Sequence, residues 1–263
     1  MKANILGKRG GILGTWIRKL EIEFDNLLND DKRIMDFYIK NNSDETPICF
    51  NFQLRTIAQK LQSDIFDNHP GKISRDYVNG KLRDAHYSEK ESVFTLRTHY
   101  HVENGRVYVK GCTLLVSTST LAQDICYNIY DLEYLWKLHS WLLRHEVGHF
   151  VDHILNDHGI TLEESDKRSD QVEEDYKNHF EWAYEYMKQP NASYATINKA
   201  YYNIPSEARA NEYAGISVDD MQKAQDDNDS NWTNKVITLD INVTGIKDLE
   251  KESDQNGDTE DFS

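Results

Sequence analysis

The stretch of sequence that decides the fold lies between Leu132 and Leu155 and reads LEYLWKLHSWLLRHEVGHFVDHIL. Its apolar residues recur three and four positions apart, which is the spacing of one face of an α-helix. His158-Gly159 follows, and a glycine just after the last apolar turn is typical of a helix end. The pattern predicts one long helix whose apolar side is formed by Leu132, Leu135, Trp136, Leu138, Leu142, Leu143 and Val147.

This helix carries the run His145-Glu146-Val147-Gly148-His149. Residues four apart on a helix share a face, so the two imidazoles project side by side, with Cβ atoms about 5–6 Å apart. Two nitrogens placed in this way can reach one zinc ion at roughly 2.0–2.1 Å. Glu146 would lie beside the metal, where it can take a proton from water and later deliver it to a leaving group. The run therefore predicts two zinc ligands and a catalytic base.

A catalytic zinc site also needs a third protein ligand and an open position. Glu207 is the leading candidate, because Pro205 begins a short alanine-rich helix that can pack closely against the metal helix. Asn211 lies one turn after Glu207 and is suited to orient a ligand from behind. Three further acids remain alternatives for the third ligand: Glu181, Glu185 and Glu212.

Asp152 and His153 follow His149 on the same face of the metal helix, three and four residues later. A third ligand from this helix is disfavoured, because three successive turns of a straight helix do not easily surround one tetrahedral ion. We interpret Asp152 and His153 as residues that orient a ligand imidazole.

The run at 145–149, followed by Glu207-x-x-Ala210-Asn211-x-Tyr213-Ala214, resembles the zincin superfamily, and within it the gluzincin-type ImmA/IrrE metallopeptidases. The resemblance covers residues 142–155 and 205–215. It implies zinc bound by His145, His149 and Glu207, with Glu146 as the catalytic base. It also implies a sheet whose outer strand lies beside the metal helix, and a side chain that stabilises the oxyanion. The candidates for that last role are Tyr201, Tyr202 and His153.

The clearest strand signals precede the metal helix. Residues 93–102 and 107–117 are rich in β-branched and aromatic side chains, and Asn104-Gly105 between them predicts a β-hairpin. Residues 16–40 show the apolar spacing of a single amphipathic helix, whereas the charged residues 162–175 are predicted to form an exposed excursion. The whole pattern predicts an α+β, zincin-like fold that is mainly helical, with a small mixed or antiparallel sheet next to the metal helix.

The domain organisation follows from shifts in composition. We predict a flexible basic arm over residues 1–15 and a single zincin-like metallopeptidase domain over residues 16–218. That domain would consist of an N-terminal helical part, 16–90, and a core of hairpin and metal helix, 91–218. A polar extension over 219–246 and a disordered acidic tail over 247–263 complete the prediction; residues 247–263 hold seven acids.

Composition limits the classes of function. The 263 residues carry a net charge of −15, and an acidic chain is a poor general nucleic-acid binder. The acids concentrate in the second half: residues 1–130 hold 18 basic and 16 acidic residues, and residues 131–263 hold 12 and 29. No apolar stretch approaches the roughly 20 residues of a membrane span, and no export signal is evident. Three scattered cysteines suggest no disulfide framework, so a cytoplasmic location is expected.

The leading hypothesis is a cytoplasmic zinc metallopeptidase that hydrolyses peptide bonds in a protein or peptide substrate. The alternative is a non-catalytic interaction or structural protein, phage- or mobile-element-encoded, that retains a zincin fold. A third hypothesis is a regulatory protease whose acidic half favours a basic partner. The oligomeric state is not indicated by the sequence.

Overall fold

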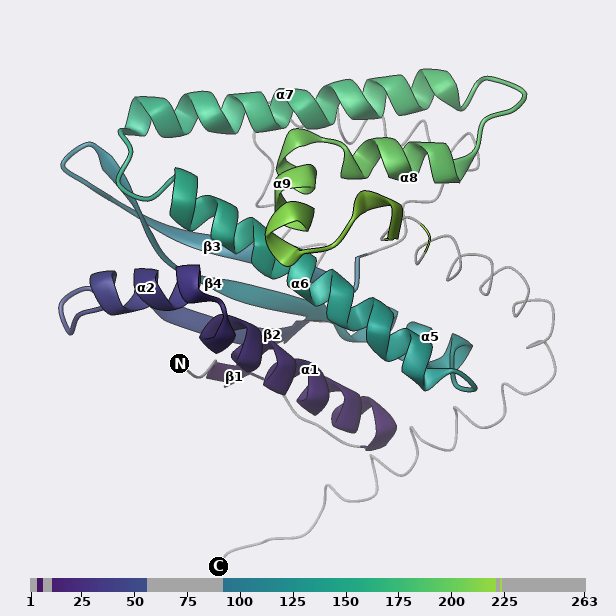
Figure 1. The fold of residues 1–263 in the computed structure, drawn as a ribbon, viewed down its shortest axis with the longest axis horizontal. Helices are drawn as coiled ribbons and strands as arrows, with labels where there is room; N and C mark the ends of the chain where they lie inside the picture. Colours follow the sequence, from purple (N-terminus) through teal and green to yellow (C-terminus); the bar gives the residue numbers. More distant parts are fainter. Residues whose placement is uncertain (1–3, 7–10, 56–91, 221–222, 224–263) are drawn as a thin grey trace, which may run out of the picture.

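The computed structural model describes residues 4–6, 11–55, 92–220 and 223. A mixed sheet carries most of the described helices on one face, and a further long helix runs beyond one edge of that sheet (Figure 1). The elements in chain order are β1 (Asn4–Leu6), α1 (Gly11–Asp30), α2 (Lys32–Asn41), β2 (Cys49–Arg55), β3 (Phe94–Glu103), β4 (Arg106–Ser117), α5 (Thr118–Tyr127), α6 (Leu132–Asn156), α7 (Leu162–Tyr186), α8 (Tyr194–Tyr202) and α9 (Pro205–Ala214).

The described strands form one sheet in the order β1-β2-β4-β3. β1 and β4 each run parallel to β2, while β3 and β4 are antiparallel, so the sheet is mixed. The predicted hairpin is confirmed: Asn104 and Gly105 both have positive φ, at 50° and 71°, between the paired residues Glu103 and Arg106. Such a turn matches the twist of the two strands it joins. The α+β class and the small mixed sheet are therefore confirmed.

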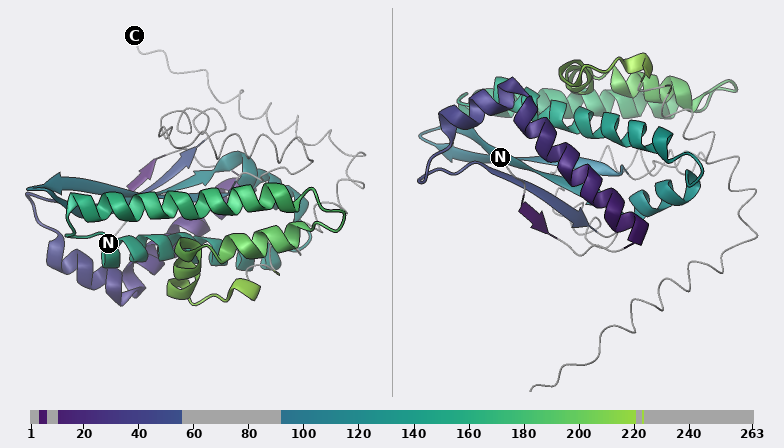
Figure 2. Two further views of the ribbon diagram at one scale, coloured as in Figure 1. Left: turned by 90° about the horizontal axis from the view of Figure 1, so that it is seen from above. Right: turned by 60° about the horizontal axis from the view of Figure 1, so that its bottom comes forward.

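The core lies between the sheet and the layer formed by α1, α2 and α6 (Figures 1 and 2). Leu20, Phe24 and Leu28 are fully buried at intervals of four on α1, as helical spacing requires. From α6, Leu135, Leu143 and Phe150 are likewise fully buried. This packing holds α6 across the sheet, and the predicted metal helix is confirmed as one element of 25 residues.

Two predictions for the N-terminal region need correction. The single helix predicted over 16–40 is broken at Asp31, whose side chain accepts a hydrogen bond from the Arg33 amide and caps a second helix, α2. The arm predicted over 1–15 is in part regular structure, because residues 4–6 pair with β2 and α1 begins at Gly11. The predictions for residues 56–90, for residues 224–246 and for the tail 247–263 lie outside the described residues.

The charged residues 162–175 are largely exposed, as predicted, but they are helical. These residues begin α7, a helix of 25 residues. The Thr161 side chain accepts from the Glu164 amide and the Glu164 carboxylate accepts from the Thr161 amide, so a capping box starts the helix. The high charge had suggested an exposed excursion, and it belongs to the solvent-facing side of this helix. None of the helices in the described parts of the chain combines the length and the apolarity that crossing a bilayer requires.

Candidate metal centre

The candidate centre forms where α6 and α9 approach each other most closely. A Cβ atom placed on Gly148 would lie 2.2 Å from the carbonyl oxygen of Ala210, far inside van der Waals contact. Glycine on α6 and a buried alanine on α9 therefore bring the two backbones together. Pro205 at the start of α9 and Gly215 in a left-handed conformation at its end delimit the short helix, as predicted.

His145, His149 and Glu207 come together at this crossing. The Nε2 atom of His145 lies 2.9 Å from Glu207 Oε2 and 3.2 Å from His149 Nε2, and His149 Nε2 lies 3.6 Å from the same carboxylate oxygen. His145 and Glu207 are buried, and His149 is partly exposed. Among the described residues, these three form a group able to hold a metal ion.

The hydrogen bonds around the group show which atoms are available to a metal. His145 Nδ1 lies 2.8 Å from the Oδ1 atom of Asn211. An amide oxygen only accepts, so Nδ1 carries the proton and, in the neutral ring, Nε2 keeps its lone pair. Glu207 Oε2, which is buried, has no hydrogen-bond partner. The lone pair of a neutral imidazole thus faces a buried carboxylate oxygen, an arrangement that a cation between them would stabilise.

The spacing of the three atoms suits zinc. Ligands at roughly 2.0–2.1 Å in a tetrahedron are separated from each other by roughly 3.3–3.4 Å. The three measured separations, 2.9, 3.2 and 3.6 Å, lie around that value. Two imidazole nitrogens and one carboxylate oxygen are also a donor set that catalytic zinc uses. The residues present therefore fit a metal ion.

Charge coupling within the group is strong. Burial by itself would raise the pKa of Glu207, but the neighbouring His149 and His145 hold that pKa well below its usual range. For the basic side chain of His149, burial acts in the opposite direction and would lower the pKa. The Glu207 carboxylate outweighs this effect and raises the pKa of His149 to about 9. At neutral pH and without a metal, the carboxylate is therefore ionised, the state that binds a metal, whereas His149 carries a proton that a metal ion would displace.

Glu146 points from α6 toward the sheet. Its Oε2 atom accepts a hydrogen bond of 2.8 Å from the backbone amide of Leu96, on β3. β3 is the outer strand of the described sheet on this side, so the Leu96 amide is directed away from β4 and toward the metal helix. Burial raises the pKa of Glu146, although the two histidines act in the opposite direction. A carboxyl group with a raised pKa beside a metal site is suited to accept and return a proton.

The other oxygen of Glu207 has two tyrosine partners. The hydroxyls of Tyr176, on α7, and Tyr201, on α8, both donate to Glu207 Oε1, the latter over 3.1 Å. Tyr202 is buried and sets its ring edge-on to the His145 imidazole, with centroids 6.0 Å apart. Tyr201 and Tyr202 were predicted as oxyanion-stabilising candidates, and both lie at the centre. Tyr201 contacts the candidate ligand Glu207, and Tyr202 contacts the candidate ligand His145.

The structure distinguishes the predicted site residues from one another. Asn211 contacts a ligand imidazole, as expected of an orienting residue. Asp152 and His153 have other partners. The Asp152 carboxylate binds the guanidinium groups of Arg168 and Arg209. His153 Nδ1 lies 2.5 Å from the Asp157 carboxylate and 2.8 Å from the hydroxyl of Tyr100. Both were predicted to orient an imidazole, and their contacts correct that prediction. The alternative third ligands Glu181, Glu185 and Glu212 are all exposed.

Two residues near the centre were missed by the sequence analysis, Tyr176 and His179, both on α7. His179 is buried, its ring lies 5.7 Å from that of Tyr201, and burial lowers its pKa to about 4, so the ring is neutral at physiological pH. Tyr176, His179, Phe180 and Ala183 recur at helical spacing, and that pattern was the available signal.

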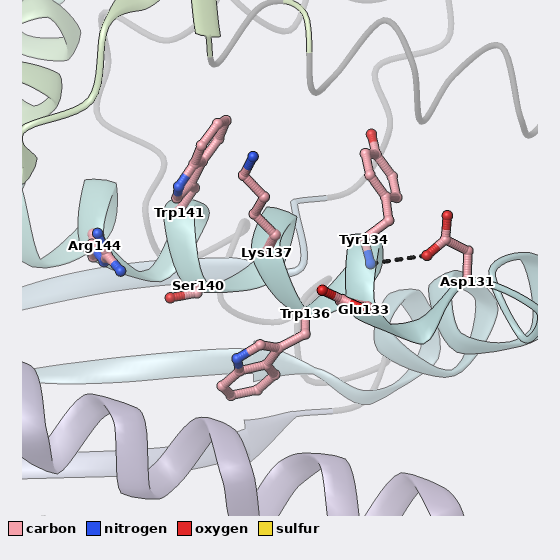
Figure 3. A pocket seen from close by; sticks show the side chains of 8 residues that line it. All are labelled: Asp131, Glu133, Tyr134, Trp136, Lys137, Ser140, Trp141 and Arg144. Carbon is pink, nitrogen blue, oxygen red and sulfur yellow. Dashed lines mark hydrogen bonds between the residues drawn. The ribbon is translucent and has the colours of Figure 1, made fainter.

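A hollow lies on the N-terminal half of α6, before His145 (Figure 3). Its volume is about 560 Å³, and it combines acidic, basic and aromatic side chains. The lining residues are Asp131, Glu133, Tyr134, Trp136, Lys137, Ser140, Trp141 and Arg144. None of the candidate metal ligands lines it, so it is separate from the centre.

No protein-family model, curated protein or solved structure matches this chain. The geometry of the centre therefore carries the functional argument.

Proposed function

We propose that this protein is a zinc metallopeptidase of the zincin type, related to the ImmA/IrrE metallopeptidases. The observation that carries the proposal is the arrangement of His145, His149 and Glu207, whose three donor atoms lie 2.9–3.6 Å apart, with Glu146 next to His145 in the same helix. Three protein ligands leave a fourth position open, as in catalytic rather than structural zinc sites.

In the proposed mechanism, each side chain has a distinct role. Zinc, when bound, supplies Lewis acidity, which lowers the pKa of water and polarises a carbonyl group. Glu146 takes the proton from the attacking water and delivers it to the leaving nitrogen. The Leu96 amide holds the Glu146 carboxylate in place, and Asn211 fixes the tautomer of His145. The outer strand β3 would bind the substrate backbone by adding a strand.

The test combines metal analysis with peptide hydrolysis. We expect about one zinc per purified chain, lost in His149→Ala and in Glu207→Ala. Glu146→Gln should keep the zinc and lose hydrolysis of a peptide library by at least about a hundredfold, because the base is gone. Glu212→Gln, an exposed acid on α9, is the matched control and should keep both.

Two results would contradict this function. Absence of zinc under zinc-replete conditions would remove the metal centre. A wild-type protein that holds zinc but hydrolyses no more peptide than Glu146→Gln would instead support the non-catalytic interaction protein.

A further inference from the structure

The two oxygens of the Glu207 carboxylate have different surroundings. Oε2 faces His145 Nε2 at 2.9 Å and His149 Nε2 at 3.6 Å and has no hydrogen-bond donor. Oε1 accepts from two phenol hydroxyls, those of Tyr176 and Tyr201. One oxygen is therefore presented to a metal while the other is held by the protein.

We infer that Tyr176 and Tyr201 are positioning residues that hold Glu207 as a one-oxygen ligand, so that tight zinc binding requires α7 to be docked. The inference rests on the proposed zinc site and deepens it. A carboxylate without these donors can rotate, or bind the metal through both oxygens. Two donors on Oε1 disfavour both alternatives and leave a coordination position for water and substrate.

Few apolar contacts attach α7 to the rest of the described chain, so the stability of its docking can change when zinc binds. Much of the surface of α7 is exposed, and nine acidic side chains occur along its 25 residues. Its own buried apolar cluster is small, consisting of Phe180 with Tyr176, Tyr184 and Met187 packed against it. Polar contacts therefore contribute much of its attachment: Arg168 to Asp152 and Asp157 near the N-terminus, and Tyr176 to Glu207 in the middle.

Zinc binding and the docking of α7 are therefore thermodynamically linked. If docked α7 strengthens zinc binding, zinc must strengthen the docking of α7 by the same factor. Because the Tyr176 hydroxyl makes the direct contact between α7 and a ligand, it should carry much of this coupling. Tyr201 contacts the same oxygen from α8 and should raise zinc affinity in the same way.

The experiment measures zinc affinity by competition with a chromophoric chelator, using the full chain and four proteins besides the wild type. These are Tyr176→Phe, Tyr201→Phe, the double variant, and Tyr184→Phe as a control that removes a hydroxyl from α7 outside the centre. Removing a residue that orients a ligand typically costs 10–100-fold in metal affinity. We expect about a tenfold loss for each single variant, a larger loss for the double variant, and no change for Tyr184→Phe.

Two further readouts separate positioning from a general structural role. Co²⁺ bound in place of zinc absorbs visible light strongly when four-coordinate and weakly when five-coordinate. The double variant should show the weaker absorption band, because the freed Glu207 carboxylate can bind the metal through both oxygens. Hydrogen exchange of α7 amides should slow when zinc is added to the wild type, and slow less in Tyr176→Phe.

The outcomes distinguish this inference from the proposed function. Wild-type zinc affinity and an unchanged Co²⁺ spectrum in folded Tyr176→Phe and Tyr201→Phe would overturn the inference and leave the zinc site intact. A wild-type protein that binds no zinc, or zinc binding that survives Glu207→Ala, would overturn the proposed function and the inference with it.

Discussion

At the scale of single residues, Gly148 decides whether the centre can form. It occupies the fourth position of the run from His145 to His149, and its missing side chain is what lets the Ala210 carbonyl approach. The spacing of the histidines places two imidazoles together, but only the approach of α9 adds a third ligand. A residue without chemistry of its own is thus as necessary to the arrangement as the ligands.

Substitution of Gly148 by alanine should therefore damage both stability and metal binding. The new Cβ would lie 2.2 Å from a backbone oxygen, so α9 must move. We expect a loss of about 1–3 kcal/mol in the free energy of unfolding, the usual cost of overpacking, together with a loss of zinc affinity. Urea unfolding and chelator competition measure the two effects. Arg144→Ala, on an exposed position of the same helix, should change neither; a fully stable, zinc-binding Gly148→Ala protein would show that the helices are not in contact.

The buried imidazole of His179 contributes to the dependence of stability on acid pH. Its pKa is lowered to about 4 in the folded protein, mainly by burial, from 6.5 in the unfolded chain. The unfolded chain then binds more protons between these values, so this contribution is fully present above pH 6.5 and is lost as pH falls toward 4. At pH 5 the loss is about 2 kcal/mol relative to pH 7. Denaturant unfolding of the chelator-treated wild type and of His179→Phe at pH 7 and pH 5 checks this. Between these pH values the free energy of unfolding of the variant should fall by about 2 kcal/mol less than that of the wild type. Equal losses would disprove it.

At the scale of elements, a buried carboxylate joins three helices. Asp152 on α6 binds Arg168 of α7 at 2.5 Å and Arg209 of α9 at 2.9 Å. Arg168 also forms an ion pair with Asp157, and Asp157 is hydrogen-bonded to His153 and Tyr100. This network lies one turn beyond His149 on α6 and sets how α7 and α9 lie beside the metal helix. Asp152, which was predicted to orient an imidazole, thus joins helices instead, whereas His153 contacts Asp157 and Tyr100 of β3.

Removing the charge of Asp152 should separate these helices. In Asp152→Asn the two arginines lose their common partner, and we expect a loss of roughly 2–3 kcal/mol, below the value for fully buried pairs because both arginines are partly exposed. Denaturant unfolding gives the value. The exposed pair Lys32–Asp36 supplies the control, since Asp36→Asn should cost less than about 1 kcal/mol. If Asp152→Asn were no less stable than Asp36→Asn, the network would not be what holds α7 and α9 against α6.

At the scale of the whole molecule, the centre collects side chains from α6, α7, α8 and α9 and a backbone amide from the edge strand β3. These elements are distant in sequence and meet only in the folded chain. A metal that binds the folded chain and not the unfolded one must therefore stabilise the fold.

Zinc should accordingly raise the melting temperature of the whole described domain. At a free zinc concentration a thousandfold above Kd, the expected gain is about 4 kcal/mol. Differential scanning calorimetry with zinc and with a chelator measures this shift. His149→Ala should show no such shift, and an equal shift in that variant would place the binding elsewhere.

Patterns that are local in the chain determined much of this protein. The two-histidine helix, the Asn104-Gly105 hairpin and the helix between Pro205 and Gly215 were all predicted, because each depends on residues a few positions apart. Asn211 was predicted to orient a ligand from its one-turn spacing to Glu207, and the structure shows it in contact with His145.

Only the tertiary structure decided the rest. Glu207 is buried at the centre while Glu181, Glu185 and Glu212 face solvent; the alanine-rich sequence around Glu207 favoured it but left the other three acids as alternatives. The contact of Tyr176 with Glu207 and the engagement of Asp152 by two arginines depend on how α7 and α9 cross α6. Helical spacing shows which side chains share a face. It does not show which other face they will meet, because that choice is made by the packing of the whole chain.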